Sequence, residues 1–153
     1  MIGILVVSHE PLGTALIHCT RHIFGRMPPQ LAALDVIPDE EPSAALAGAR
    51  ELMSRINDGS GVLVLTDIYG ATPSRIAAQL AEPHRVVVIA GVNLPLLVKA
   101  LYNRRVPLDE VTELLSASAR NAIVEIEPQV APGEGGAAGR GAGEEDGASD
   151  AEG

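Results

Sequence analysis

Aromatic side chains are almost missing from this chain of 153 residues, which has no Trp, one Phe and two Tyr. A core therefore has to be built from Leu, Val, Ile and Ala, which pack well between parallel strands and helices. Cysteine is equally scarce: Cys19 stands alone, so no disulfide can form within the chain. A single cysteine within a helical pattern indicates a reducing compartment or a small buried side chain.

Positive charge is also in short supply, with 11 Lys and Arg against 20 Asp and Glu and a net charge of −9. Nucleic-acid binding needs a basic face that displaces counterions, so we expect no nucleic-acid partner. The apolar stretch at residues 1–7 lacks the basic flank of a signal peptide, and no later run has the length of a membrane span. We therefore expect a cytoplasmic protein that does not insert into the membrane.

Residues 131–153 contain no Val, Ile, Leu or aromatic residue and consist mainly of Gly, Ala and acidic side chains. Six acids against Arg140 give this segment −5 of the net charge, which leaves −4 for residues 1–130. Nothing in the segment offsets the entropy lost on ordering it. The sequence thus predicts one folded domain over residues 1–130, followed by a disordered acidic tail over 131–153.

Within the predicted domain, apolar β-branched runs alternate with helical patterns. The predicted strands are 2–7, 32–37, 62–65 and 86–90, and the predicted helices are 12–24, 44–56, 72–80, 94–103 and 107–120. This alternation favours an α/β fold with an open sheet of four parallel strands and helices on both faces. Residues 123–127 alternate apolar with acidic side chains, a pattern typical of an edge strand or a strand that meets a partner.

Two helix details follow from local patterns. The first helix carries an apolar stripe at roughly helical spacing, which predicts its buried face: Leu12, Leu16, Cys19, Ile23 and Phe24. Ser43 is a favourable N-cap for the second helix.

Two loops stand out as a candidate site. In open parallel sheets, ligands bind beyond the carboxyl ends of the strands, where the winding reverses. This rule selects residues 8–13 after the first strand and residues 67–73 after the third. We expect these loops to be neighbours in space. The turn at 91–95 follows the fourth strand, which ends at the same edge. It is either simply a turn and a helix start, or it has a part in shaping the site or the dimer.

His9 lies at the end of the first predicted strand, where a neutral imidazole with an ordinary pKa of about 6.5 is a good nucleophile. Asp67 is placed to accept the proton of Nδ1, which would leave Nε2 free to attack. Phosphoryl transfer requires mainly positioning and charge stabilisation, so this pair suits a phosphoryl carrier. The plain alternatives are a loop histidine bonded to a carbonyl and an aspartate that only caps a helix.

A transferred phosphoryl group needs hydrogen-bond donors around its oxygens. The start of the third predicted helix, at Gly70, Ala71 and Thr72, would supply backbone N–H groups and a hydroxyl without a lysine. A permanent cation would hold the group tightly, whereas a carrier has to release it. We therefore predict phosphate binding by these three residues.

Other chemistries fit less well. His18 and His22 have the spacing of zinc ligands on a helix, but no suitable third ligand is near them in the sequence, so we expect both to face solvent and no metal to bind. The Gly-rich phosphate loops of nucleotide-binding folds are missing, and we expect no cofactor. A response-regulator receiver needs clustered acids after its first strand, where this chain has His9 and Glu10.

Three segments resemble signatures of a known family in order and spacing. These are GILVVSHEPLG, GVLVLTDIYGATPSRIA and VVVIAGVNLPLLVKAL. They are similar to the mannose-type (mannose, fructose and sorbose) enzyme IIA of the sugar phosphotransferase system, and the resemblance runs over residues 2–127.

The resemblance implies a flavodoxin-like sheet and a homodimer that exchanges a C-terminal strand, here residues 123–127. It places the family's nucleophile at His9, its orienting aspartate at Asp67, and its phosphate-receiving helix start at Ala71 and Thr72. It further implies a phosphotransferase that works through a phosphohistidine intermediate. The donor would be the phosphorylated carrier HPr, and the acceptor a IIB component for sugar uptake.

The chain departs from the family pattern in two places. Glu10 and Pro11 follow the histidine, where family members often have glycine, and this adds a negative charge beside the site. The C-terminal segment is too short to be a IIB domain. A second hypothesis is therefore a regulatory protein whose phosphorylation state is sensed by a partner and which transports no sugar.

Overall fold

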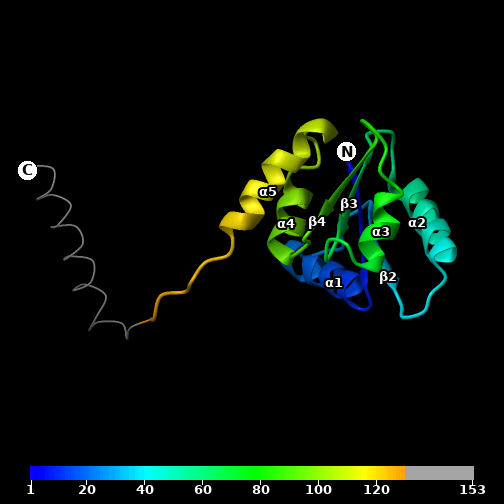
Figure 1. Cartoon of the computed structure of the whole chain (residues 1–153). Helices are drawn as coiled ribbons and strands as arrows, with labels where there is room; N and C mark the ends of the chain where they lie inside the picture. Colours follow the sequence, from blue (N-terminus) through cyan, green and yellow to red (C-terminus); the bar gives the residue numbers. More distant parts are fainter. Residues whose placement is uncertain (130–153) are drawn as a thin grey trace, which may run out of the picture. The chain divides into compact units, whose positions relative to one another are not determined.

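The computed structural model describes residues 1–129, and Figure 1 shows the arrangement of their helices and strands. The elements are β1 (Gly3–His9), α1 (Leu12–Phe24), β2 (Leu31–Val36), α2 (Pro42–Ile56), β3 (Val62–Thr66), α3 (Thr72–Ala78), β4 (Val86–Ala90), α4 (Leu94–Tyr102), a 3-10 turn η1 (Leu108–Glu110) and α5 (Val111–Asn121). The alternation of strands and helices is the one that the sequence predicts.

The four strands form one parallel sheet in the order β2-β1-β3-β4. This is the strand order of flavodoxin-like sheets, which confirms the predicted fold class. The two central strands, β1 and β3, pair directly, with Val7 opposite Thr66. His9 and Asp67 each follow this pair closely, so the register brings the ends of both strands to one place.

Helices cover both faces of the sheet because the central strands are apolar on both sides (Figure 1). Ile4 and Val6 point to the face that carries α1, α4 and α5, whereas Leu5 and Val7 point to the face that carries α2 and α3. The helices contribute small and aliphatic side chains to these two layers: Leu16, Leu96, Leu97, Leu115, Ala45, Ala49, Ile76 and Ala77. The core therefore consists of two thin layers of mainly aliphatic side chains, one on each face of the sheet, and does not need large aromatic rings.

The predicted buried face of α1 is only partly correct. Leu16 is buried and Phe24 packs against the core, but Leu12, Cys19 and Ile23 are exposed. The residues that α1 buries are Gly13, Leu16, Ile17 and Thr20. The cause is the close docking of Gly13: a Cβ at this position would lie 2.8 Å from Asp35 Oδ1 and 3.0 Å from Ser8 Oγ. This contact sets the rotation of the helix and turns part of the predicted stripe, including Cys19, toward solvent.

The start of α2 also differs from the prediction. The helix begins at Pro42, its N-cap is Glu41, and Ser43 lies inside the first turn. Proline is favoured at the first helical position, because its missing N–H has no partner there in any helix. The proline therefore moves the start of the helix ahead of the serine.

Arg104 is a buried cation that the sequence did not reveal. The residue is only 6% exposed, and its guanidinium donates hydrogen bonds to the carbonyl oxygens of Ile2 (2.9 Å), Pro29 (2.5 Å) and Gln30 (2.7 Å). Burial lowers its pKa from the usual value of arginine, and the charge of Asp58 acts in the opposite direction. Arg104 thus joins the loop after α4 to the amino ends of β1 and β2.

Residues 123–129 have no regular secondary structure, and the side chains of Ile123, Val124 and Ile126 are exposed. The predicted strand at 123–127 is therefore not formed within a single chain, and its exchange between two chains stays a prediction. The predicted tail at 131–153 lies outside the described residues. No helix within residues 1–129 has the length and apolar character needed to cross a membrane.

Candidate functional site

His9 and Asp67 meet at the carboxyl end of the sheet, as the sequence predicts. The ring Nδ1 of His9 lies 2.7 Å from Asp67 Oδ2, and the backbone N–H of His9 donates to the same oxygen at 2.9 Å. Two bonds to one carboxylate oxygen fix both the backbone and the ring of His9. The contact orients the imidazole so that Nδ1 carries the proton toward the carboxylate.

Asp67 is held as an anion. Its side chain is only 9% exposed, and this burial would by itself raise its pKa. The opposing hydrogen bonds from the backbone and ring of His9 and from the backbone N–H of Ile68 (2.8 Å) prevail, so the pKa of Asp67 lies below its usual value. The carboxylate is thus ionised at neutral pH and stabilises a positive charge on the ring.

The ring nitrogen that does not contact Asp67, Nε2, is accessible. The His9 side chain is 51% exposed, and its Nε2 has no hydrogen-bond partner among residues 1–129. A ring that is held at Nδ1 and free at Nε2 is prepared for nucleophilic attack through Nε2.

The loop after β4 is hydrogen-bonded to the segment that carries Asp67. The backbone N–H of Gly91 donates to the carbonyl of Asp67 at 2.7 Å, and that of Val92 donates to the carbonyl of Thr66 at 2.9 Å. Asn93 then caps α4 by accepting the N–H of Leu96 at 2.8 Å. Residues 91–95 thus form a turn and a helix start, and their bonds to Thr66 and Asp67 also support a part in shaping the site.

The three predicted phosphate-binding residues differ in what they offer. The N–H of Gly70 donates to Ser74 Oγ at 3.1 Å, and the N–H of Ala71 donates to the carbonyl of Ile68 at 3.2 Å. Both amides are therefore occupied within the turn. The backbone N–H and hydroxyl of Thr72 have no hydrogen-bond partner in the described part of the chain, so Thr72 alone presents free donors.

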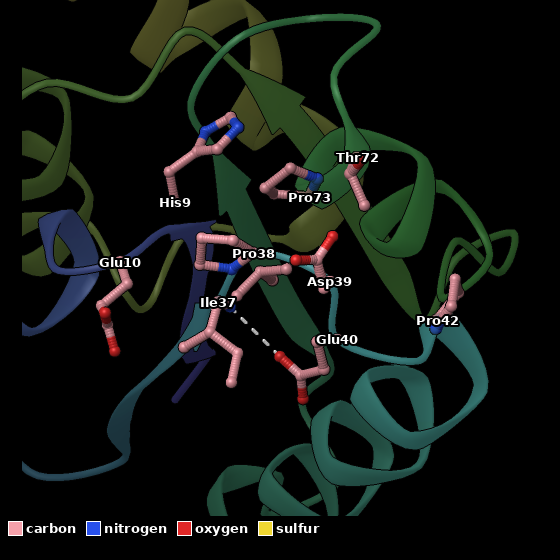
Figure 2. Close-up of a pocket in the computed structure, with 10 residues that line it drawn as sticks. His9, Glu10, Ile37, Pro38, Asp39, Glu40, Pro42, Thr72 and Pro73 are labelled. Carbon is pink, nitrogen blue, oxygen red and sulfur yellow. Dashed lines mark hydrogen bonds between the residues drawn. The ribbon is translucent and has the colours of Figure 1, made fainter.

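A pocket of about 470 Å³ opens beside His9 on the face of α2 and α3 (Figure 2). Thr72 and Pro73 line it together with His9, which places the predicted nucleophile and the free donors of Thr72 in one cavity. The remaining lining comes from the end of β2 and the loop that follows it: Val36, Ile37, Pro38, Asp39, Glu40 and Pro42, with Glu10 from the end of β1.

The sequence reasoning missed this contribution of the loop after β2. A signal was available, because β2 is parallel to β1 and residues 38–42 follow its carboxyl end. This signal assigns the loop to the pocket only if β2 is known to lie next to β1. A local sequence pattern does not reveal that strand order.

Acidic side chains surround the pocket. Glu10, Asp39 and Glu40 line it, and none of its lining residues is Lys or Arg. Glu10 precedes Pro11 in a cis peptide bond. The site therefore combines a histidine with an accessible ring nitrogen, neutral hydrogen-bond donors and acidic surroundings.

The other histidines have simpler surroundings. His18 and His22 are exposed on α1, as predicted, and no group of three His, Cys, Asp or Glu residues within 1–129 is arranged to hold a metal ion. His84 Nδ1 lies 2.9 Å from Asp109 Oδ2, with both side chains exposed.

Comparison with known families decides the relationship. The sequence model of the family described as "EIIA-man: PTS system fructose IIA component" matches residues 3–118. The chain belongs to this family. The predicted resemblance to mannose-type IIA components of the sugar phosphotransferase system is thereby confirmed, and the match contains His9, Asp67 and the loop at 70–73.

Two curated relatives show how far the similarity of this IIA chain extends. It is 32% identical over 102 residues to the "PTS system fructose-specific EIIA component" of Bacillus subtilis, covering 66% of this chain and 69% of that protein. It is 25% identical over 125 residues to the "PTS system mannose-specific EIIAB component" of Escherichia coli K12. That second match covers 80% of this chain but only 38% of the Escherichia coli protein.

Solved structures of IIA components have the same fold. The mannose/sorbose specific IIA subunit of Enterococcus faecalis aligns with a TM-score of 0.72 at 22% identity, covering 85% of this chain and 98% of that one. EIIA from Streptococcus agalactiae also aligns with a TM-score of 0.72 at 22% identity, over 82% of this chain and 97% of that one. The fold of the IIA chain is therefore conserved where the sequence has diverged widely.

Proposed function

We propose that the chain is a phosphoryl carrier that accepts a phosphoryl group from phosphorylated HPr on His9 Nε2 and passes it to a IIB component. The observation that supports this most is the contact of His9 Nδ1 with the Asp67 carboxylate at 2.7 Å, combined with an exposed Nε2. Membership of the IIA family supports this choice of donor and acceptor.

The transfer balances without any added reactant. The Nε2–P bond forms as the N–P bond of the donor histidine breaks, and the donor ring leaves as a neutral imidazole. Nδ1 of His9 keeps its proton toward Asp67, so the ring becomes cationic against an anionic carboxylate. Transfer to the acceptor is the same step in reverse, with His9 as the leaving group.

Thr72 is the residue that we propose to receive the phosphoryl oxygens, because its N–H and hydroxyl are free and it lines the pocket with His9. Gly70 and Ala71 would serve the same group by shaping the turn before it. Gly70 adopts a φ of 92°, a left-handed conformation that favours glycine, and Ala71 is the N-cap of α3.

The names of the relatives suggest the wider setting. The Escherichia coli relative is a mannose-specific EIIAB component, and the Bacillus subtilis relative is a fructose-specific EIIA component. We propose by analogy that this chain serves the uptake of a sugar of this class and delivers its phosphoryl group to a IIB protein or domain.

A homodimer is the assembly we propose for the carrier. β4 is an edge strand, and beside it lies a groove of about 240 Å³ whose lining includes Ile89, Leu96, Arg120 and the chain's own Ile123. The exposed side chains of Val124 and Ile126 suit the groove of a second copy, and Arg120 suits the glutamates that alternate with them.

The direct test is phosphoryl transfer from purified, phosphorylated HPr to the wild-type chain and to variants. We expect labelling of the wild type, no labelling of His9→Ala, and at least about 100-fold slower labelling of Asp67→Ala, because the ring loses its orienting anion. Thr72→Val should be slowed and Thr72→Ser should not. Full labelling of His9→Ala would overturn the assignment.

The same assay separates transport from regulation. Rapid loss of the label to a IIB protein supports a role in sugar uptake. A stable phosphohistidine that changes the binding of another partner, with no drain to IIB, supports the regulatory alternative.

A further inference from the structure

Asp39 occupies an unusual position in the pocket beside His9. Its backbone has a φ of 64°, a left-handed conformation that is rare for residues other than glycine and that asparagine and aspartate tolerate best. The turn is fixed on both sides, because the N–H of Glu40 donates to the carbonyl of Ile37 at 3.3 Å and the N–H of Ile37 donates to Glu40 Oε1 at 3.2 Å. The chain thus holds Asp39 in a strained conformation at the pocket.

The three pocket carboxylates are not equivalent. That of Glu40 is engaged by the N–H of Ile37, and Figure 2 shows the side chain of Glu10 directed away from His9. In the same view the carboxylate of Asp39 is directed toward Pro73 and Thr72, the side of the pocket where a phosphoryl group would lie. Asp39 is therefore the acidic group best placed to act on a group carried by His9.

A phosphoryl group carries a charge of about −1.5 to −2 at neutral pH. In this pocket it would meet Asp39 with no Lys or Arg among the lining residues to compensate. Like charges at close range in a partly enclosed site repel each other, so the phosphorylated state is raised in free energy relative to the free histidine.

We propose that Asp39 sets the phosphoryl-transfer potential of His9, keeping the phosphohistidine poorly retained so that the group passes onward to the acceptor. This inference rests on the proposed function, since it concerns the state in which His9 carries the group. Asp39 acts through the field at the phosphoryl group and takes no part in bond formation. The strained turn of residues 37–40 is the means by which the chain keeps the carboxylate there.

The matched test compares Asp39→Asn with Glu41→Gln. Asparagine also tolerates the left-handed backbone, so Asp39→Asn removes the charge and preserves the turn. Glu41 lies in the same loop but outside the pocket lining, so Glu41→Gln makes the same change in net charge away from the site. Each variant is mixed with HPr and phosphorylated HPr until the phosphoryl group is distributed at equilibrium.

We expect Asp39→Asn to raise the equilibrium constant for phosphorylation of His9 about three- to tenfold at low salt, while Glu41→Gln matches the wild type. The difference between Asp39→Asn and wild type should shrink as salt is raised, because ions screen the charge; a purely structural role would not produce this dependence.

The inference is overturned if Asp39→Asn and wild type share one equilibrium constant at low salt, or if Glu41→Gln shifts it equally. Failure of the proposed function looks different: the wild type would then take up no label from HPr, or His9→Ala would keep it. If the wild type is labelled on His9 but Asp39→Asn has the same equilibrium constant for phosphorylation, only this inference is refuted and the proposed function stands.

Discussion

Asp67 is the residue on which the geometry of the site depends. Its carboxylate accepts hydrogen bonds from the backbone N–H and the ring Nδ1 of His9 and from the backbone N–H of Ile68. These bonds favour its charged form against burial and lower its pKa. The sequence predicted the contact with the ring from two strand ends. It did not predict the backbone bonds, which depend on the turn of each chain segment after its strand.

A lowered pKa in the folded state makes the contribution of Asp67 to stability pH-dependent. The contribution is complete above the unfolded-state pKa of about 3.9 and is lost as pH falls through the lower folded-state value. We therefore expect Asp67→Asn to lower the melting temperature at pH 7, and the difference from wild type to narrow as pH falls below about 4. Thermal unfolding of both proteins across this range checks it, and a difference that widens toward acid would contradict it.

Arg104 shows what composition and periodicity cannot reveal at this scale. Its three carbonyl partners come from the amino end of β1 and from the loop before β2, far away in the sequence. An arginine next to a second arginine at the end of a helix has the pattern of a solvated residue. Only the tertiary arrangement makes it a buried one.

At the scale of elements, the strands and most helix bounds were predictable, because strands covered on both faces are continuous apolar runs. The buried face of α1 was predictable only in part, since it depends on the approach of Gly13 to Asp35 and Ser8 from neighbouring strands. Asp35 also accepts the N–H and hydroxyl of Thr14, at 3.2 Å and 2.5 Å, and so caps the start of α1 from another element. A helical wheel drawn from the sequence of α1 shows neither the approach of Gly13 to the strands nor the bonds of Thr14 to Asp35.

This docking predicts opposite effects for two glycine-to-alanine changes. Alanine favours a helix by up to about 1 kcal/mol over glycine, but Gly13→Ala forces a contact of 2.8 Å with Asp35 Oδ1. Overpacking of this kind costs about 1–3 kcal/mol, so we expect Gly13→Ala to lower the free energy of unfolding.

Gly48 in α2 is the matched control. A Cβ there meets only Leu34 Cδ1 at 3.6 Å, an ordinary contact, so Gly48→Ala should keep the gain in helix propensity and raise the free energy of unfolding. Urea unfolding of the two variants measures both signs. The docking explanation fails if Gly13→Ala is as stabilising as Gly48→Ala.

At the scale of the whole molecule, the two ends of the sheet have different tasks. Arg104 ties the amino ends of β1 and β2 together, while the carboxyl ends of β1, β2 and β3 carry His9, the acidic loop and Asp67. The general rule for ligand sites in open sheets predicted that the loops after β1 and β3 meet at this end, where the pocket beside His9 lies. It did not predict the third loop of the pocket, because that requires the strand order.

Two C-terminal truncations, one without and one with the predicted exchange strand, test assembly into a dimer. Residues 1–123 form a compact unit, so deletion of 124–153, which removes all but the first residue of the predicted exchange strand, should leave the fold intact and yield a monomer. Deletion of 130–153 keeps the predicted exchange strand and should leave a dimer. Sedimentation velocity distinguishes the two, and an identical oligomeric state for both truncations would contradict strand exchange through 123–127.

The position of the phosphoryl group on the ring of His9 tests the central claim most directly. Because Asp67 holds Nδ1, the account predicts that the chain phosphorylated by HPr carries the group on Nε2 of His9, as phosphorus–proton NMR of the intact protein can show. A group found on Nδ1 of His9, or on any other residue, would contradict it, since the Nδ1–Asp67 contact would then have no place in the reaction.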